Sequence, residues 1–368
     1  MTENEMKPSI RFKGFTDAWE QRELGSEGTT FTGLSGKTKD DFGHGEGSFV
    51  TYMNVFKNPI ADPQMVEPID IDNSQREIKY GDIFFTTSSE TPDEVGMSSI
   101  WQEKASNTYL NSFCFGYRLN NLNKYDLNFL AYNFRADSFR KDMVLLAQGI
   151  SRYNISKNKV MEIQTAIPKD KEEQIKIGRF LVDVDSLITL HQRKCEKLQD
   201  LKKSLLEKMF PAEGSNTPSI RFKGFTDAWE QRELGQTVII TMGASPDGST
   251  YSDTPSEHIL IQGNADLVDG WVCPRVWTTQ ITKKADAGDL IMSVRAPAGA
   301  MGKTAYNAVI GRGVAAIKGN EFIFQTLNKM DSDGYWKKLS AGSTFESLNS
   351  DAIKTAEIKV PDIKEQKK

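Results

Sequence analysis

Apolar residues in the middle of the chain recur at steps of three and four positions, which is the period of an α-helix. No proline interrupts the stretch between Pro168 and Pro211. The pattern therefore predicts one helix over residues 170–210, roughly 60 Å long at 1.5 Å per residue. We expect Asp170 and Glu173 to cap its start. The stripe consists of Ile177, Phe180, Val184, Leu187, Leu198, Leu201 and Leu205.

This stripe resembles a coiled-coil seam, and such a seam requires a partner helix. A long helix that lies on one of the neighbouring globular regions is the alternative, and the pattern leaves it open. Lysine, glutamate and leucine dominate the stretch, and its outer positions are charged. The composition therefore favours a coiled coil.

The regions on either side of this helix share an arrangement of turns and apolar runs. In the first, Gly81-Asp82 precedes the apolar run 83–85, and in the second, Gly288-Asp289 precedes the run 290–292. Each pattern predicts a tight turn that leads into a buried strand. Later residues predict a helix and then a closing strand in each region, at 126–147 and 160–167 in the first and at 321–339 and 353–360 in the second.

A literal repeat organises the whole chain. The 18 residues Pro8–Gly25 recur without change as Pro218–Gly235, at an offset of 210 positions. A period of this length is too long for a solenoid repeat or a propeller blade, so it indicates two whole domains that begin with the same segment. The sequences between the repeats differ, which is typical of one fold whose binding loops have diverged.

The predicted fold class is α+β, with two similar mixed α/β domains in tandem joined by a long coiled-coil-type helix. Residues 1–25 are the first opening segment and 26–168 the first domain. The spacer helix and its flanks occupy 169–213 and the second opening segment 214–235. The second domain spans 236–360. Residues 361–368 repeat the start of the spacer helix and predict the beginning of a second such helix, cut off near Lys368.

Composition excludes several classes of protein. The 368 residues include 46 Lys and Arg against 50 Asp and Glu, which gives a formal net charge of −4, so the chain is no histone-like polycation. The three cysteines are far apart, and this spacing argues against a disulfide framework. No apolar run is long enough to span a membrane, and the first residues contain no apolar signal core. We therefore expect a cytoplasmic protein.

The motifs that resemble catalytic or metal-binding signatures are incomplete. Gly302-Lys303-Thr304 resembles part of a phosphate-binding loop, but Pro297 stands where that motif requires glycine. The three histidines are too isolated for a zinc site. We expect neither a cofactor nor a metal, and no catalytic residue.

Polar loops follow the predicted strands, and they carry residue types that are able to contact DNA. Phosphates accept hydrogen bonds from Lys, Arg and hydroxyl groups, and base edges are read mainly by Arg, Asn, Gln, Ser and Thr. We expect Trp271 and Trp277 to pack in the fold rather than stack on bases. The predicted DNA-contacting residues are Lys37, Lys39, Thr87, Ser88, Ser89, Ser151, Arg152, Tyr153 and Asn154 in the first domain, and Lys283, Lys284, Arg295, Ser343, Thr344 and Phe345 in the second.

Together, the duplicated opening segment, the two divergent domains and the long helix resemble the specificity subunit of type I restriction–modification systems. The most specific part of the resemblance is residues 171–178 and 187–194 of the helix. It implies two target recognition domains that each read one half of a split site on double-stranded DNA. It also implies helices that set the spacing and dock two modification (methyltransferase) subunits, while further partners carry translocation and cleavage.

Two expectations modify this picture. Residues 26–165 carry 14 basic and 18 acidic side chains and residues 236–360 carry 12 and 13, so binding of DNA by the chain alone should be weak and sensitive to salt. Because the second helix is cut off, we expect self-association through the unpaired helix seam, or its coverage by a modification subunit. The alternative function is a non-enzymatic tandem scaffold that binds protein, peptide or glycan.

Overall fold

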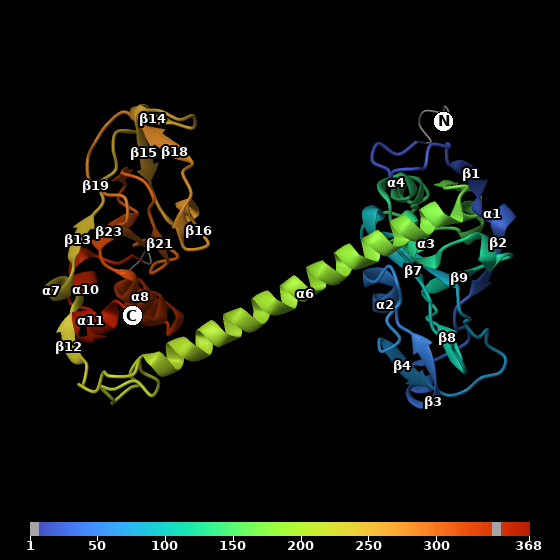
Figure 1. The fold of residues 1–368 in the computed structure, drawn as a ribbon, viewed down its shortest axis with the longest axis horizontal. Coiled ribbons are helices and arrows are strands. Elements are labelled where there is room, and N and C mark those ends of the chain that lie inside the picture. Colours follow the sequence, from blue (N-terminus) through green and yellow to red (C-terminus); the bar gives the residue numbers. More distant parts are fainter. Residues whose placement is uncertain (1–6, 341–346) are drawn as a thin grey trace. The chain divides into compact units, whose positions relative to one another are not determined.

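The computed structural model describes residues 7–340 and 347–368 and divides into two compact units, residues 1–193 and 194–368. The long helix α6 (Lys171–Met209) begins in the first unit and ends in the second (Figure 1). Its 39 residues confirm the single helix predicted over 170–210.

A four-stranded antiparallel sheet forms the centre of the first unit, with the strand order β2-β9-β5-β7. A second sheet has the order β4-β3-β8, in which β3 and β8 run parallel. The strands are β1 (Glu20–Glu23), β2 (Gly28–Thr32), β3 (Phe42–Val50), β4 (Val66–Ile69), β5 (Ile83–Thr86), β6 (Ser88–Ser89), β7 (Ser98–Ile100), β8 (Thr108–Leu110), β9 (Cys114–Leu119), β10 (Tyr153–Asn154) and β11 (Gln164–Ile167).

Helices cover one face of the central sheet of the first unit and complete its core. Phe85 of β5 stacks on Phe115 and packs against Phe134 and Phe139, and all four rings are buried. The helix predicted over 126–147 is instead two helices, because the backbone of Ala136 between them is extended, with φ of −64° and ψ of 148°. The helices are α1 (Leu24–Glu27), α2 (Tyr52–Lys57), α3 (Leu127–Asn133), α4 (Asp137–Leu145) and α5 (Lys157–Val160), with 3-10 turns at Lys39–Asp41, Pro92–Glu94 and Leu122–Lys124.

The second unit contains a six-stranded sheet, β13-β23-β20-β21-β17-β16, and a five-stranded sheet, β14-β18-β15-β22-β19. Its strands are β12 (Glu230–Glu233), β13 (Ile239–Met242), β14 (Tyr251–Ser252), β15 (His258–Ile261), β16 (Leu267–Val268), β17 (Trp271–Val272), β18 (Val276–Thr278), β19 (Lys284–Ala285), β20 (Leu290–Ser293), β21 (Met301–Lys303), β22 (Ala308–Ile310), β23 (Val314–Lys318) and β24 (Glu357–Val360).

The helix predicted over 321–339 is also divided, into α8 and α9. Gly334, with φ of 75°, adopts the left-handed conformation between them, and this conformation ends α8. The helices of the second unit are α7 (Leu234–Thr237), α8 (Glu321–Ser332), α9 (Tyr335–Ser340), α10 (Ser350–Lys354) and α11 (Ile363–Gln366), with 3-10 turns at Gly248–Thr250 and Asn264–Asp266.

One topology underlies both units, as the shared turns predicted. The order β2-β9-β5-β7 of the first unit recurs as β13-β23-β20-β21 in the second, and the parallel pair β3 and β8 recurs as β15 and β22. Gly81 and Gly288 have φ of 84° and 97°, and the strands that follow them, β5 and β20, are buried along their length. The predicted turn and buried strand are therefore confirmed in each unit.

The closing strands are shorter than predicted, because the residues before them form helical turns. In the first unit, α5 precedes β11, and in the second, α10 precedes β24. Each closing strand pairs antiparallel with a strand of the repeated segment, β11 with β1 and β24 with β12.

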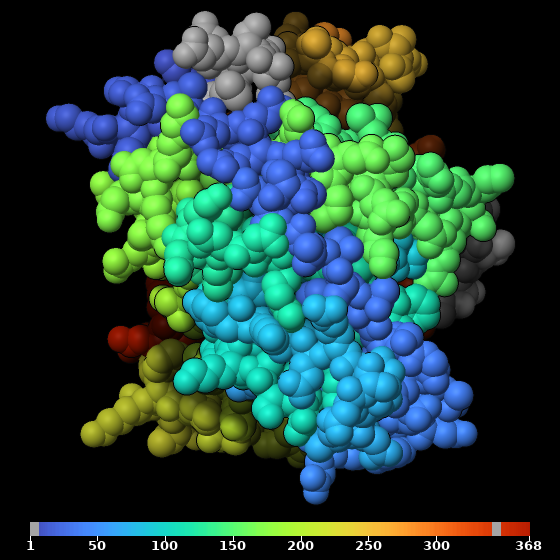
Figure 2. Space-filling model, turned by 90° about the vertical axis from the view of Figure 1, so that its right-hand side faces the viewer, coloured from blue at the N-terminus to red at the C-terminus, as the bar shows by residue number. Residues whose placement is uncertain are grey.

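The first opening segment fixes the start of α6. The guanidinium of Arg11 donates two hydrogen bonds to the Glu173 carboxylate, at 2.6 and 2.8 Å, and only 1% of the Glu173 side chain is exposed. The Trp19 indole lies 3.4 Å from the same carboxylate. About two turns further along α6, the ring of Phe180 meets that of Phe12 edge to face. Figure 2 shows the opening segment (blue) against this part of α6 (yellow-green).

The second opening segment makes the same contact with α11. Arg221 donates to both carboxylate oxygens of Glu365, at 2.7 and 2.8 Å. The next residue of each helix is a glutamine that donates to the carbonyl of the proline ahead of the helix, Gln174 to Pro168 and Gln366 to Pro361. The repeated sequence therefore performs the same structural task twice.

The predicted capping pair of α6 is half correct. Asp170 accepts from the backbone N–H of Glu172 at 2.8 Å, as a capping residue does. Glu173 does not complete a capping box, because its carboxylate is occupied by Arg11. Gly178 explains the close approach of α6 to the first unit, since a Cβ atom there would lie 2.5 Å from the Asp126 carboxylate and from the Phe129 nitrogen.

We predict that Arg11→Ala destabilises the contact between the opening segment and α6 by about 3–5 kcal/mol, because it leaves the buried Glu173 carboxylate without its cation. Hydrogen exchange of peptides covering residues 8–25 and 171–180 measures the loss. Lys13→Ala is the matched control, since Lys13 is exposed on the same segment. Equal exchange in the two variants would contradict the assigned role of Arg11.

Candidate nucleic-acid interface

Two polar segments that are distant in sequence lie side by side in the first unit. The short strands β6 and β10 pair antiparallel, so that Ser89 lies opposite Tyr153 and Ser88 opposite Asn154. The adjoining backbone N–H of Ile155 donates to the Thr87 carbonyl at 3.0 Å. The structure thus joins the two groups of residues that the sequence predicts to contact DNA in this unit.

The second unit has the same junction at the equivalent place. Arg295 forms an isolated bridge with Ser347, and the backbone N–H of Leu348 donates to the Val294 carbonyl at 2.9 Å. Arg295 itself is exposed. Three of the predicted residues, Ser343, Thr344 and Phe345, lie outside the residues that the structure describes.

Hydroxyl groups of the 86–91 run mostly stabilise the loop that contains them. The Thr87 hydroxyl donates to the Phe113 carbonyl at 2.8 Å. Ser88 and Ser89 are buried, and the Ser89 hydroxyl donates to the Glu94 carboxylate at 3.2 Å. These contacts give the hydroxyls a structural role, and their contact with DNA stays a prediction.

Arg152 is the exposed cation at this junction. Its guanidinium carbon lies 5.6 Å from the centre of the Phe113 ring, and no carboxylate within the described ranges forms an ion pair with it. Ser151 and Asn154 beside it are also exposed, and Tyr153 is half-buried. The junction borders a pocket of about 730 Å³, which Tyr52, Met53 and Phe56 of α2 also line.

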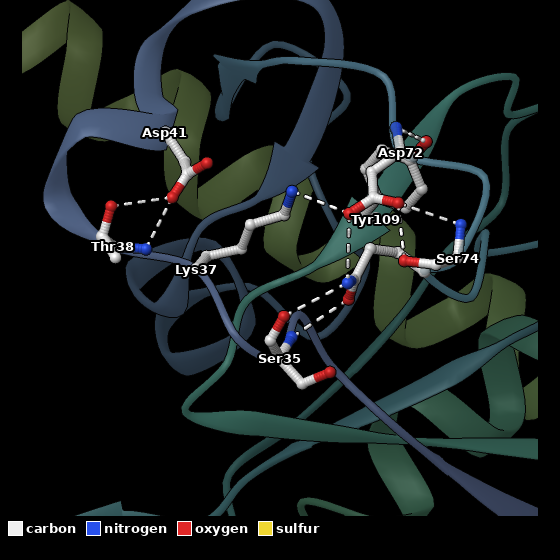
Figure 3. Close-up of polar contacts among 8 residues, drawn as sticks. Ser35, Lys37, Thr38, Asp41, Asp72, Ser74 and Tyr109 are labelled. Atoms are coloured by element: carbon white, nitrogen blue, oxygen red, sulfur yellow. Dashed lines mark hydrogen bonds and ion pairs between the residues drawn. The ribbon is translucent and has the colours of Figure 1, made fainter.

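The two lysines predicted to bind phosphate in the first unit differ in their surroundings. Lys37 forms an ion pair with Asp72 at 2.7 Å, and only 13% of its side chain is exposed (Figure 3). Asp72 also accepts from the backbone N–H and hydroxyl of Ser74. Lys39 is exposed and has no ion-pair partner among the residues with assigned structure. Lys39 is therefore the lysine whose charge is open to solvent.

In the second unit, Lys283 and Lys284 are exposed and unpaired within the part of the chain that the structure covers. Sequence reasoning missed the contacts of Lys303, whose ammonium lies 4.9 Å from the Trp271 ring and 4.8 Å from the Phe324 ring. Unlike the other two lysines, Lys303 is paired, with Glu321 at 3.0 Å. Trp271 is half exposed, so its packing is only partial. The spacing of Lys303, Trp271 and Phe324 in sequence gives no signal of their contact.

The predicted seam of α6 is covered only near its start. Ile177 packs against the core of the first unit, whereas Phe180 meets Phe12 on one side and is still 55% exposed. Further along, more than half of the Leu187, Leu198 and Leu201 side chains is exposed. Val184 is half-buried, and Leu205 is 36% exposed.

Among residues 7–340 and 347–368, no group of three or more His, Cys, Asp or Glu side chains is arranged to hold a metal ion. No helix in the same ranges has the length and apolar character needed to cross a membrane.

Comparisons with known proteins identify the class of this fold. Residues 18–200 match the family model described as the type I restriction modification DNA specificity domain. A relative from Methanocaldococcus jannaschii, named as a putative type I restriction enzyme MjaX specificity subunit, is 26% identical over 300 residues, which cover 78% of this chain and 69% of the relative.

Two solved structures share the fold. The S subunit of a type I restriction–modification system from M. genitalium has a TM-score of 0.65 at 14% identity. The match covers 98% of this chain and 90% of the M. genitalium chain. The second comes from work on the structural basis of complex assembly and conformational transition of the type I R-M system. It has a TM-score of 0.50 at 22% identity, and the match covers 98% of this chain and 89% of that chain.

The fold and the family match define a DNA-recognition protein with two tandem domains on a long helix. The chain belongs to the DNA specificity subunits of type I restriction–modification systems. Its task within that family is recognition of DNA and not catalysis. The comparisons therefore decide against the alternative of a scaffold for protein, peptide or glycan.

The contacts of Asp72 predict a pH-dependent stability. The Lys37 ammonium and the hydrogen bonds from Ser74 lower the pKa of Asp72 well below its ordinary value. The carboxylate therefore stabilises the fold fully above its unfolded pKa of about 3.9, and this contribution is lost as the pH falls through the lower, folded value.

We expect the difference in urea midpoint between the wild type and Asp72→Asn to be equal at pH 7 and pH 5 and to shrink below about pH 4. The control is Asp40→Asn, because Asp40 is exposed and forms no ion pair within the described ranges. A difference that persisted unchanged at pH 3 would show that the effect is not one of charge.

Proposed function

We propose that each unit reads one half of a bipartite site on double-stranded DNA. The observation that carries this proposal is the repeated topology: the same sheet order holds the same junction of two loops in each unit, but the residues on those loops differ. A shared frame with different exposed side chains suits two readers of unrelated sequences.

The exposed cations at and near the two junctions support this assignment. Lys39, Arg152, Lys283, Lys284 and Arg295 are exposed. Arginine suits a guanine edge, whereas lysines on the flanking loops suit phosphates. Because acidic residues outnumber basic ones in both domains, we infer that partner subunits supply part of the grip on the duplex.

We propose that α6 sets the spacing of the two half-sites and forms part of the docking surface for two modification subunits. The methyltransferase chemistry then lies in those subunits, and translocation and cleavage lie in further subunits recruited through the complex. Such a complex acts in the cytoplasm, where the DNA is.

The exposed part of the α6 seam supports a helical partner. A fully buried leucine contributes about 1.5–3 kcal/mol, and Leu187, Leu198 and Leu201 are all more than half exposed. We propose that the seam is covered either by a second copy of this chain, through a two-fold axis, or by a helix of a modification subunit.

Arg295→Ala tests the proposal that the second unit reads one half of the DNA site. If Arg295 meets a guanine edge, the variant should lose about 1–3 kcal/mol of discrimination at one base pair and leave the other half of the motif unchanged. Sequencing the methylated motif of a host that carries the variant with intact partner subunits measures this change.

Lys284→Ala is the matched comparison. Loss of a phosphate contact should weaken binding to all DNA sequences alike and reduce the slope of log K against log salt concentration by about one. A motif that changed in both halves together in Arg295→Ala would contradict the assignment of one half-site to each unit.

Leu198→Lys and Leu201→Lys should abolish the coverage of the seam, because each places a charge at an apolar contact. Light scattering on the chain alone and with modification subunits measures the assemblies. Gln199→Lys introduces the same charge beside the seam and should assemble like the wild type. If the wild-type chain stayed monomeric with α6 fully helical, both alone and with modification subunits present, the proposed coverage of the seam would be contradicted.

A further inference from the structure

We propose that the pocket beside Arg152 in the first unit reads a guanine–cytosine base pair, with Arg152 donating to guanine and Glu90 accepting from cytosine. This inference rests on the proposed function and adds the base pair and a residue, Glu90, that the sequence did not suggest.

The pocket has a volume of about 730 Å³ and an apolar wall on one side. Tyr52 and Phe56, one helical turn apart on α2, have parallel rings with centres 6.0 Å apart. The Tyr52 hydroxyl donates to the Ser88 carbonyl at 2.8 Å and so ties α2 to β6. This wall is therefore fixed to the strand that leads to Glu90.

Phe113 also lines the pocket, and its backbone is held by hydrogen bonds of its N–H and of its carbonyl. Its N–H donates to the Asn111 side chain at 2.8 Å, and its carbonyl accepts from the N–H and the hydroxyl of Thr87 at 2.9 and 2.8 Å. The residue is nevertheless 53% exposed. A rigid backbone with an exposed ring provides a platform rather than a core contact.

Arg152 lies over this platform with its donors available. Its guanidinium interacts with the face of the Phe113 ring, and a cation–π contact of this kind uses none of the five N–H donors of the arginine. No ion pair to Arg152 exists within residues 7–340 and 347–368. The group is thus oriented by the ring and retains the donor pair that matches guanine O6 and N7.

Of the two carboxylates at the pocket, one is occupied and one is open. Glu94 accepts from the hydroxyls of Ser89 and Thr91, at 3.2 and 2.9 Å. Glu90 is exposed, and its carboxylate has no hydrogen-bond or ion-pair partner among the residues of assigned structure. Glu90 is therefore the acceptor available to a ligand.

A base edge suits this pair of groups better than a phosphate does. Two carboxylates at the rim of the pocket repel a phosphate, because like charges at close range cost energy. A guanine–cytosine pair presents two acceptors and one amino donor along its major-groove edge, and these match a free guanidinium and a free carboxylate.

Two half-buried arginines hold the walls of the pocket in position. Arg135 donates to the carbonyls of Val55 and Phe56 at the end of α2, at 2.8 and 3.0 Å. Arg140 donates to the Gly96 carbonyl at 2.8 Å, in the segment that follows Glu94. Burial lowers the pKa of Arg135 to about 10, so the side chain stays protonated and keeps its donors at neutral pH. Both arginines are positioning residues for the pocket.

The test uses the full chain with its modification subunits, and the readout is the methylated motif and the methylation rate on duplexes that differ at one base pair. Glu90→Gln should admit an adenine in place of the cytosine, since an amide can pair with adenine. We expect the preference for cytosine over adenine to fall by about 5- to 150-fold. Arg152→Lys keeps the positive charge but removes the paired N–H donors of the guanidinium. This variant should weaken the preference for guanine in the same base pair.

Glu103→Gln and Arg76→Ala are the matched controls, because both residues are exposed in the first unit and away from the pocket. They should leave the motif unchanged. Arg152→Lys with an unchanged motif would show a phosphate contact and overturn the inference, as would a Glu90→Gln variant with wild-type preference at every position. A wild-type complex whose methylated site has only one half would instead contradict the proposed function.

Discussion

The contact on which both units depend is a buried pair of charges joined by two hydrogen bonds. Arg11 and Glu173 form it in the first unit, and Arg221 and Glu365 form it in the second. The planar guanidinium fork meets both carboxylate oxygens, so the pair fixes an orientation as well as a distance. A glutamine on the next residue of each helix ties the helix start to the chain ahead of it. The start of a helix is thereby held at a defined place on the fold that precedes it.

This arrangement explains why the opening segment can be identical in two units whose other residues differ. The segment contributes a strand to the closing pair of each unit and an arginine to the helix, and both tasks depend on the shared frame. The loops at the junctions of β6 with β10 and of Arg295 with Ser347 carry no part of this frame. Their side chains can therefore change without disturbing the helix, which is what a protein with variable DNA specificity requires.

Sequence patterns predicted the features that depend on local order. The apolar spacing predicted α6, and the glycine–aspartate pairs predicted the turns before β5 and β20. The breaks at Ala136 and Gly334 were missed because an apolar period continues through a short turn. Contacts between distant residues could not be predicted. The ion pair of Lys37 with Asp72 and the occupation of Glu173 by Arg11 arise only when the fold brings those residues together. For the same reason, the burial of Ser88 and Ser89, whose contact with DNA stays a prediction, could not be read from the sequence.

The central claim is that two independent readers share one frame, and exchange of a single domain tests it most directly. Residues 26–165 are replaced by the corresponding domain of another specificity subunit, and both opening segments and α6 are kept. The account predicts that sequencing of the methylated DNA shows a new first half, the original second half and the original spacing between them. A change in both halves, or a change in the spacing with α6 intact, would contradict it.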